Sequence, residues 1–495
     1  MDSPHSAEPL KAVAPAADAR SERAATLLIA LTSSTAYALS YFWRYPIFML
    51  PDSIAKTHVA TLFGAAFDLQ AAWSLAVPLG FGAAKLPAVV FATSRFFFRH
   101  RLASINALLV SSMLTAVLPP LVFAASPAAQ VAGVLVSSFL ASFLFGCIVT
   151  YLEGRRRTEV LVAAISAGLV CAGTLSRGTA SALLQAGVPP RWMPLLIGAA
   201  TCPVSCLLMA LTAAAPPPSA ADVAARTARA PMPPSEQRRF VSSYAVGVAL
   251  SVLAYAVLLG VRSFRDFYSR QIFGAALGVA SPPAAVVIVA DLPGAALVCA
   301  GLVGLSYVAD SRRALLLMLG AAALALALTL ALTVAFRARA IGGLAWILSY
   351  STTFYLGYSV LATPLYERLF AATRTEGTCV FLIFLSDFAG YVVTIAMLLY
   401  QSFGPGLAPP AGAAAADAEL LRLFVAMAIA AAALVCAALV AAAAYFRWRL
   451  EPAAAVCAEA ADRLDSRTAL LRDAARGGDS QSGSGSASPA SERPG

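Results

Sequence analysis

Twelve long apolar segments fill most of this sequence, and they restrict the chain to folds that are built inside a membrane. A helix needs about 20 predominantly apolar residues to cross a bilayer. Charged residues make up only 12% of the chain, about half their share in a typical soluble domain. The segments are 24–50, 66–94, 102–124, 128–152, 158–182, 192–214, 241–268, 282–308, 312–336, 341–363, 376–402 and 419–446. We expect each to be a helix, because the bilayer offers the backbone no other hydrogen-bond partner.

Lysine and arginine gather on one side of the twelve expected spans. Each of the seven chain ends and loops on that side carries at least two of them. The opposite side holds only Lys56, Arg191, Arg270, Arg337 and Arg339. Because positively charged loops stay in the cytoplasm, both termini are predicted to be cytoplasmic. The net charge of +10 then needs no nucleic acid, and the expected partners are membrane lipids and a small-molecule substrate.

Nothing in the sequence has the spacing of a metal or catalytic site. Cys202 and Cys206 share a helix face, but two thiols alone are a weak zinc site, and we interpret them as packing residues. The three histidines are scattered, and neither a Ser-His-Asp set nor a glycine-rich phosphate loop is evident. We therefore predict no cofactor, no metal and no enzymatic activity.

A polar, proline-rich segment at 215–240 divides the spans into two groups of six. We interpret it as a cytoplasmic linker between an N-terminal half, 24–214, and a C-terminal half, 241–446. Residues 1–23 are predicted to form a cytoplasmic N-terminal segment. The tail, 447–495, ends in a Gly, Ser and Pro-rich stretch and is predicted to be cytoplasmic and largely disordered.

Three landmarks recur at nearly one offset in the two halves. The tripeptide RTE begins at 157 and again at 374, so the offset is 374 − 157 = 217. Arg44 and Arg262 differ by 218, and Arg95 and Arg312 by 217. Two halves repeated in the same orientation are typical of facilitator transporters, whose substrate site lies between them. The predicted fold is all-α transmembrane, with twelve helices of the major-facilitator type in two six-helix parallel repeats.

Two arginines lie inside apolar sequence at these related positions. Arg44 is in AYALSYFWRYPIFML, 36–50, and Arg262 is in AYAVLLGVRSFRDF, 254–267. Placing an ionised guanidinium in a bilayer costs roughly 2.5–3.5 kcal/mol on insertion scales, and such residues often mark a substrate path. Since the planar guanidinium suits phosphate or carboxylate, we expect both to face one cavity and hold an anion. The alternative is that each extends to the headgroup level.

Other polar residues within the spans complete the predicted site. Tyr41 and Tyr255 lie near the arginines and are predicted to contact substrate, and Arg265 is expected to share or replace the role of Arg262. Lys85, inside the second span, is predicted either to contact substrate or to form an ion pair.

Three acidic residues of the second half are candidates for coupling or ion pairing: Asp266, Asp291 and Asp387. Asp266 can neutralise Arg262 or Arg265. A carboxylate in a membrane relays protons or pairs with a cation, and pairing is the more common use. Arg177, in the fifth span, either lines the cavity or marks the end of that span, and we favour the second interpretation.

Charged residues at the cytoplasmic ends of the spans are predicted to form latches between them. The candidate gating residues are Glu153, Arg157, Asp310, Arg312, Glu367 and Arg374. We expect such ion pairs to hold one state of a rocking transporter closed.

The sequence around both arginines resembles the organophosphate:phosphate antiporters of the major facilitator superfamily. The matching stretches are YALSYFWRYPIF, 37–48, VLLGVRSFRDF, 257–267, and PLGFGAAKLP, 78–87. In the last of these, Gly80, Phe81 and Lys85 match in kind, although the spacing differs. The resemblance implies a phosphorylated substrate.

The chain as a whole is more similar to a family of uncharacterised, major-facilitator-like bacterial membrane proteins. This similarity is carried by YLEGRRRTE, 151–159, YERLFAATRTEGT, 366–378, and FLSDFAGYVVTIAMLLYQSFG, 384–404, and it covers nearly all of 30–405. It implies the fold and no particular substrate.

We therefore predict a monomeric secondary active transporter that moves a small organic anion, such as a phosphorylated metabolite, by alternating access. Exchange for phosphate needs no protonatable carboxylate, whereas proton symport would use Asp291 or Asp387. The alternatives are a polytopic membrane enzyme that acts on lipid, or a transporter-like receptor or scaffold without transport.

Overall fold

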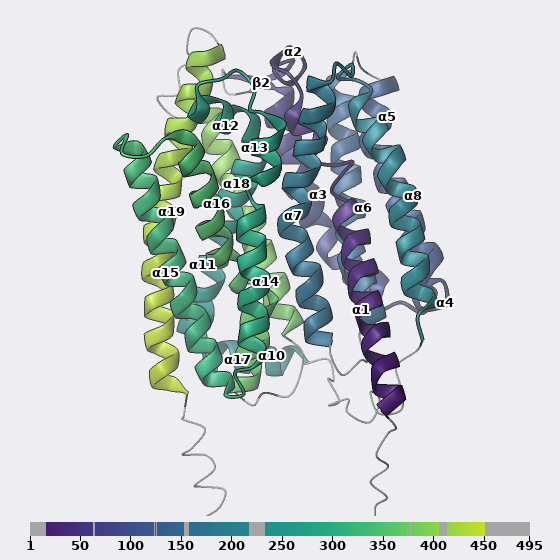
Figure 1. The fold of residues 1–495 in the computed structure, drawn as a ribbon, viewed down its shortest axis with the longest axis vertical. Coiled ribbons are helices and arrows are strands. Elements are labelled where there is room, and N and C mark those ends of the chain that lie inside the picture. The colour runs from purple at the N-terminus through teal and green to yellow at the C-terminus, as the bar shows by residue number, and fades with distance from the viewer. Residues whose placement is uncertain are drawn as a thin grey trace, which may run out of the picture. The chain divides into compact units, whose positions relative to one another are not determined.

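A computed structural model describes residues 16–62, 65–122, 124, 126–152, 158–216, 233–373, 375, 379–404 and 413–450. The chain divides into two compact units, Met1–Tyr445 and Phe446–Gly495, and the first holds the helical bundle (Figure 1). Among the described residues, nine helices are long and apolar enough to cross a membrane. The prediction of a multi-pass helical membrane protein is confirmed.

The first half contains six long helices, and each corresponds to one expected span. They are α1 (Ala16–Leu39), α3 (Leu69–Ala92), α5 (Arg101–Val122), α6 (Pro127–Leu152), α7 (Thr158–Gln185) and α8 (Met193–Ala214). The short elements between them are η1 (Pro46–Met49), α2 (Asp52–Ala55), β1 (His58–Leu62), β2 (Ala65–Asp68) and α4 (Arg95–Arg99).

The second half supplies the other six spans. They are α11 (Ala245–Phe267), α13 (Ala284–Val289) followed by α14 (Leu292–Ser306), α15 (Ser311–Arg337), α16 (Gly343–Val360), α18 (Val380–Phe403) and α19 (Ala413–Arg449). The shorter helices are α10 (Pro234–Ser243), α12 (Ser269–Leu277) and α17 (Thr363–Ala372). The eighth span is broken at Asp291 because Pro293 has no N–H to continue the helical ladder.

The two halves repeat the same helix pairings in the same order. In the first half α3 packs on α6, α5 on α6, and α1 on α7. Six spans later, α14 packs on α16, α15 on α16, and α11 on α18. A repeat without inversion relates the halves by an axis along the membrane normal. The fold is the predicted major-facilitator type, with α13 and α14 counted as one span.

Two helix contacts make most of the junction between the halves. Helix α7 packs against α13 and α14, and α3 packs against α18. On helix surfaces away from these contacts, large apolar side chains such as Leu86, Val90 and Leu324 are exposed, as expected for faces that a bilayer covers. The ion pairs Lys85–Asp387 and Arg177–Asp266 lie at the junction instead.

The first apolar segment is not one continuous helix, although its length suggested one. Helix α1 ends at Leu39, and the next residues follow tight turns, with Arg44 N donating to Tyr41 O at 3.1 Å. Pro46 then opens η1, where its missing N–H leaves no helical hydrogen bond unmade. Arg44 therefore lies beyond the end of its helix, whereas Arg262 lies within α11.

An antiparallel hairpin, β1–β2, joins the first two spans. It lies near α2 and α12 at the upper end of the bundle in Figure 1, and the sequence did not predict it. Asp68, the last residue of the hairpin, accepts a hydrogen bond from Ala71 N at 2.8 Å and caps the start of α3. We call this end of the bundle the α2/α12 end, and the other the α10/α17 end.

Candidate functional site

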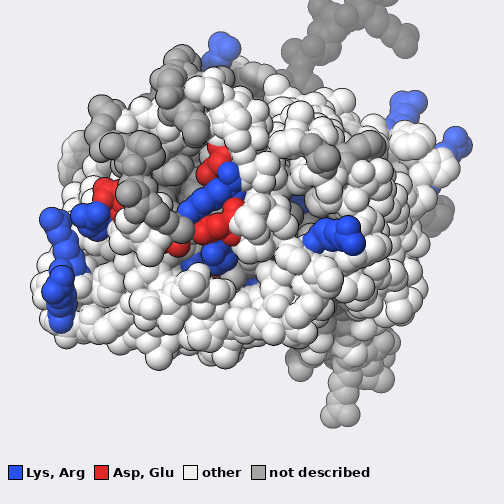
Figure 2. Space-filling view, turned by 90° about the horizontal axis from the view of Figure 1, so that it is seen from above, with Lys and Arg blue, Asp and Glu red and all other residues white. Residues whose placement is uncertain are grey.

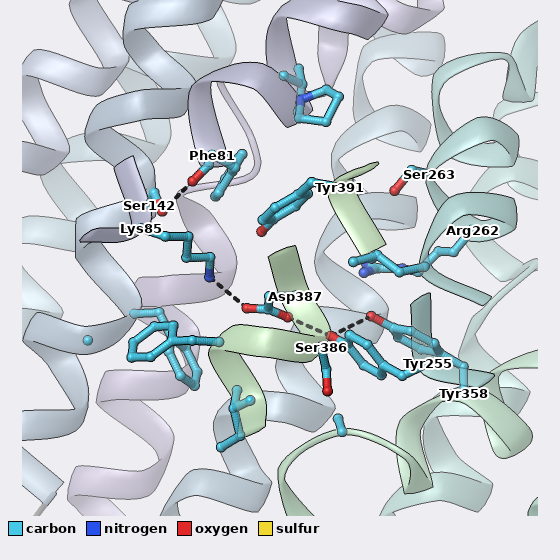
Figure 3. A pocket seen from close by; sticks show the side chains of 18 of the residues that line it. Phe81, Lys85, Ser142, Tyr255, Arg262, Ser263, Tyr358, Ser386, Asp387 and Tyr391 are labelled. Carbon is cyan, nitrogen blue, oxygen red and sulfur yellow. Dashed lines mark hydrogen bonds and ion pairs between the residues drawn. The ribbon is translucent and has the colours of Figure 1, made fainter. Parts of the chain in front are cut away.

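A cavity of about 210 Å³ lies between the two halves. Its walls come from α1, α3, α6 and α7 of the first half and from α11, α16, α17 and α18 of the second (Figure 3). Eleven of its 27 lining residues are aromatic, whereas aromatic residues make up only 9% of the whole chain. They are Tyr37, Tyr41, Tyr45, Phe81, Phe145, Tyr255, Phe267, Tyr358, Tyr366, Phe384 and Tyr391. The cavity lies where the repeat predicted a substrate site.

An ion pair crosses the cavity from one half to the other. Lys85 Nζ of α3 lies 2.6 Å from Asp387 Oδ2 of α18. The second carboxylate oxygen, Oδ1, accepts a hydrogen bond from Tyr255 Oη at 2.9 Å, and Tyr358 Oη donates to Tyr255 Oη at 3.4 Å (Figure 3). Both charged side chains are about one-fifth exposed. Of the two roles predicted for Lys85, the structure shows the ion pair.

Arg262 lines the same cavity from α11. Its Nε lies 3.4 Å from Tyr355 Oη and 3.7 Å from Asp266 Oδ2, both long contacts. The guanidinium also lies over the rings of Tyr355 and Tyr358, at 5.8 and 5.4 Å from their centroids. These partners are weak for a cation that is only 11% exposed, so Arg262 is suited to binding an added anion.

Arg44 does not line the cavity. Its Nε donates to Ser40 O at 2.9 Å and its Nη2 to Ser40 Oγ at 3.1 Å. Its guanidinium lies over Tyr41 and Phe81, at 4.3 and 5.3 Å from the ring centroids, and these two rings do line the cavity. The predicted pair of facing arginines is not present in this structure, because the turn after α1 directs Arg44 behind aromatic rings.

Four charged residues form a buried cluster beside the cavity, where α7 of the first half meets α11 and the α13–α14 break. Arg265 and Asp291 pair through two hydrogen bonds, Nη1 to Oδ1 at 2.9 Å and Nη2 to Oδ2 at 2.8 Å. Asp266 accepts from Arg265 Nη2 at 2.9 Å and lies 3.1 Å from Arg177 Nη2. All four side chains are about 1% exposed.

The buried cluster corrects two predictions and confirms a third. Arg177 does not mark the end of a span; it lies within α7 and pairs across the junction of the halves. Arg265 was predicted to contact substrate, but it is buried away from the cavity and committed to Asp291. Asp266 does neutralise the neighbouring arginines, since it contacts Arg262, Arg265 and Arg177.

The charges around the cavity leave a positive excess. On its wall, Lys85 and Arg262 face one carboxylate, Asp387, so the sum is 2 − 1 = +1. The buried cluster has two arginines and two aspartates and adds nothing. Arg44, behind the rings, adds one further charge. The charges of these eight side chains therefore sum to +2.

The cavity is closed toward the α2/α12 end by contacts between the halves. Asp52 of α2 pairs with Arg270 of α12, and Lys56 lies 3.4 Å from Asp52. One layer deeper, Gln70 Nε2 donates to Phe267 O at 3.0 Å, and Gln271 Nε2 donates to Gln70 Oε1 at 2.6 Å. Figure 2 shows charges of both signs gathered in the middle of this end. The sequence analysis named Lys56 and Arg270 only for their side of the membrane and did not predict these contacts. Asp52, Lys56, Arg270 and Gln271 lie in or beside the short helices α2 and α12, and Gln70 lies in the first turn of α3.

The predicted gating residues are only partly described. Glu153, Arg157 and Arg374 lie outside the described residues, and Glu367 lies in α17.

Asp310 caps the start of α15, where its Oδ1 accepts from Arg312 N at 3.0 Å. A residue that the sequence did not single out, Arg368 of α17, donates to Val308 O and Leu305 O at 3.3 and 3.2 Å. It thereby fastens α17 to the end of α14. The role of Asp310 and Arg312 in gating stays a prediction.

Comparison with known proteins places the chain in a family. The model of a family of unknown function, DUF5690, matches residues 57–449. The chain belongs to this family. That agrees with the resemblance to an uncharacterised family, whereas the resemblance to organophosphate:phosphate antiporters stays a prediction. No curated protein matches the sequence.

Solved transporter structures share the fold at low sequence identity. The nucleoside transporter NupG is 14% identical, with a TM-score of 0.55, over 84% of this chain and 98% of its own. A bacterial homologue of the human lysosomal transporter Spinster, inward-facing and occupied, is 15% identical, with a TM-score of 0.55, over 86% and 98%. The xylose transporter XylE from E. coli, partially occluded and inward open, is 14% identical, with a TM-score of 0.56, over 82% and 98%. At this identity they support the fold alone.

Proposed function

We propose that this protein is a secondary active transporter that carries a small organic anion across the membrane by alternating access. The observation that carries the proposal is Arg262, a weakly paired cation in the wall of a cavity formed by both halves. A guanidinium held in a low-dielectric site attracts an anion strongly and directs its orientation. The proteins that share the fold are named as transporters, which agrees with this proposal.

Alternating access follows from the way the halves meet. The contacts that close the α2/α12 end involve side chains of α2, α3 and α12, and they can separate without unfolding either six-helix half. Rocking of the halves would open this end and close the other around a fixed site. In the same proposal, both termini and the linker lie in the cytoplasm, at the α10/α17 end, and the protein acts as a monomer.

Coupling to protons is assigned to Asp387 rather than to Asp291. Asp291 is fully buried, does not line the cavity and is held by two hydrogen bonds from Arg265. Asp387 lies in the cavity wall, and its partner Lys85 belongs to the other half. When the halves move apart, Asp387 would separate from Lys85, so this ion pair would change during the transport cycle.

Transport assays in proteoliposomes test the proposal. Vesicles that hold the full-length protein are loaded with a mixture of candidate anions, and exchange of labelled benzoate, phosphoenolpyruvate and glucose 6-phosphate is followed. We expect exchange of at least one anion that Arg262→Gln abolishes and that Arg337→Gln, an exposed arginine outside the cavity, leaves unchanged. Exchange that persists in Arg262→Gln, or that occurs only with uncharged solutes, would contradict the anion proposal.

Side-specific labelling tests the proposed orientation. Single cysteines placed at Ser219 and Ser482 in a cysteine-free background should react only from the cytoplasmic side, because the arginine excess lies there. A cysteine at Pro409 should react only from the opposite side. Any of the three reacting from the wrong side would contradict the proposed topology.

A further inference from the structure

We propose that the transported anion is a monovalent carboxylate that carries a planar aromatic ring, such as an arene or indole carboxylate. The inference rests on the proposed function and names its substrate class. In this arrangement the carboxylate lies on Arg262 and the ring lies among the tyrosines of the cavity wall. Three features of the cavity support this: the aromatic surfaces, the absence of amide, glutamate and histidine side chains among the lining residues, and the single excess charge.

The aromatic surfaces come from both halves and are arranged in stacked pairs. Tyr255 and Tyr358 stack with their ring centroids 5.4 Å apart and 20° between their planes. Phe81 of α3 and Tyr391 of α18 stack across the junction at 6.0 Å and 29°. In Figure 3, Tyr391 lies above Asp387, with Lys85 on one side of the view and Arg262 on the other. A flat ring that enters this space extends an existing stack on either side.

The polar groups of the wall are mostly tyrosine and serine hydroxyls: seven tyrosines and four serines line the cavity, beside Lys85, Arg262 and Asp387. Among the lining residues, all of which are described, there is no Asn, Gln, Glu or His. Of the serines, Ser142 Oγ donates to Phe81 O at 3.3 Å, Ser386 Oγ shares a hydrogen bond with Tyr366 Oη at 2.5 Å, and Ser359 Oγ has no hydrogen-bond partner in the described part of the chain. A sugar phosphate would depend on these hydroxyls alone to pair its own desolvated hydroxyl groups, and each group left unpaired is costly. An arene has no such groups.

The net charge of the cavity wall, +1, matches a ligand that carries one negative charge. Lys85 is neutralised by Asp387 at 2.6 Å, so Arg262 supplies the excess charge. The other nearby cation, Arg44, is covered by Tyr41 and Phe81 and donates to Ser40. A phosphate monoester carries about −1.5 to −2 at pH 7 and would bring more charge than the wall offers. A carboxylate carries one and accepts two parallel hydrogen bonds from a guanidinium.

The size of the cavity agrees with a small ring system. Its volume of about 210 Å³ is below the roughly 300–1,000 Å³ of pockets for drug-sized ligands. A ligand with one or two fused rings is therefore favoured over a nucleotide or a peptide.

Equilibrium binding to the purified full-length protein in detergent tests the inference. The probes are benzoate, phenylacetate and indole-3-acetate, with three comparison compounds: cyclohexanecarboxylate for the ring, benzamide for the charge and glucose 6-phosphate for the sugar phosphate. We expect at least one aromatic carboxylate to bind roughly three- to tenfold more tightly than cyclohexanecarboxylate, the gain that aromatic stacking adds. Benzamide and glucose 6-phosphate should bind more weakly still.

Two variants connect the binding to the residues. Arg262→Gln should remove binding of every carboxylate. Tyr358→Leu should bring the preference for benzoate over cyclohexanecarboxylate close to one, whereas Tyr307→Leu, which changes a tyrosine that is 83% exposed, should leave it unchanged. Each variant is first shown to be monodisperse by size-exclusion chromatography, so that a loss of binding is not a loss of fold.

The outcomes separate this inference from the proposed function. If glucose 6-phosphate or cyclohexanecarboxylate binds as tightly as the aromatic carboxylates and Arg262→Gln still abolishes binding, the aromatic class is wrong and anion transport stands. If no carboxylate binds through Arg262 and benzamide binds to the wild type and to Arg262→Gln alike, both are wrong. If none of the three aromatic carboxylates binds, the inference is overturned.

Discussion

The protein contains two groups of charged residues at the junction of its halves, and they differ in how completely their charges are paired. In the buried cluster beside the α13–α14 break, Arg177, Arg265, Asp266 and Asp291 are about 1% exposed and each charge has a partner. In the cavity wall, Lys85 and Asp387 are about one-fifth exposed, and Arg262 has only long contacts. Balanced charge with burial indicates a structural role, although Arg177 Nε, Arg177 Nη1 and Arg265 Nε have no hydrogen-bond partner in the described part of the chain. Excess charge beside a cavity indicates a binding role.

One residue, Asp266, connects the buried cluster to the charged residues of the cavity wall. Asp266 lies 3.7 Å from Arg262 and 3.1 Å from Arg177, so one carboxylate belongs to both groups. An anion bound to Arg262 would weaken the contact between Arg262 and Asp266. Asp266 would then interact only with Arg177 and Arg265. Arg262, in the cavity wall, is therefore one contact away from the ion pair between Arg177 of α7 and Asp266 of α11.

The largest effect is expected from the buried cluster. Asp291→Ala would leave Arg265 buried without its bidentate partner, and removing one member of a buried pair typically destabilises a protein by about 3–5 kcal/mol. We expect a large fall in the thermal unfolding temperature in detergent and a poor yield of folded protein. Asp310→Ala, which removes a helix cap whose side chain is 26% exposed, should lower the unfolding temperature much less. Equal stability of Asp291→Ala and wild type would break the comparison.

Substitution of Asp387, the acidic member of the ion pair in the cavity wall, is expected to have a large effect on transport and a small effect on stability. Asp387→Asn keeps the size of the side chain and its acceptor for Tyr255, but it removes the group that can take up a proton. We expect uptake driven by a pH gradient to be lost while exchange of substrate across equal pH is retained. If gradient-driven uptake survives, Asp387 is not the coupling residue, and exchange for a second anion becomes the better description.

The smallest effect is expected at the contacts that close the α2/α12 end. Asp52 is 27% exposed, and a partly exposed ion pair contributes only about 0–1 kcal/mol. Asp52→Asn should therefore leave the unfolding temperature nearly unchanged but shift the population toward opening at this end. A cysteine introduced at Ser263, in the cavity wall, should then react up to about fivefold faster with a membrane-impermeant reagent applied from that side. No change in its rate would show that these contacts do not control access.

Much of the fold could be predicted from the sequence, because it depends on local properties of the chain. Length and apolarity determine which segments span a membrane, and all twelve expected spans have a counterpart among the described helices. The break at Asp291 follows from Pro293, which cannot donate a helical hydrogen bond. The hairpin β1–β2 was missed because most of it lies in the segment expected to be a loop between the first two spans. The early end of α1 was missed because the residues up to Leu50 are apolar enough to continue a helix.

The sequence by itself determined the list of charged and aromatic residues that a membrane would force into the interior, including Arg262, Lys85, Asp291 and Asp387. Only the tertiary structure decided which of them meet. Lys85 pairs with a residue 302 positions away, and Arg177 reaches Asp266 from the other half. Arg262 and Arg265 share a helix, yet one lines the cavity and the other is buried. Such pairings depend on the rotation of each helix and on its neighbours, which no local pattern of residues encodes.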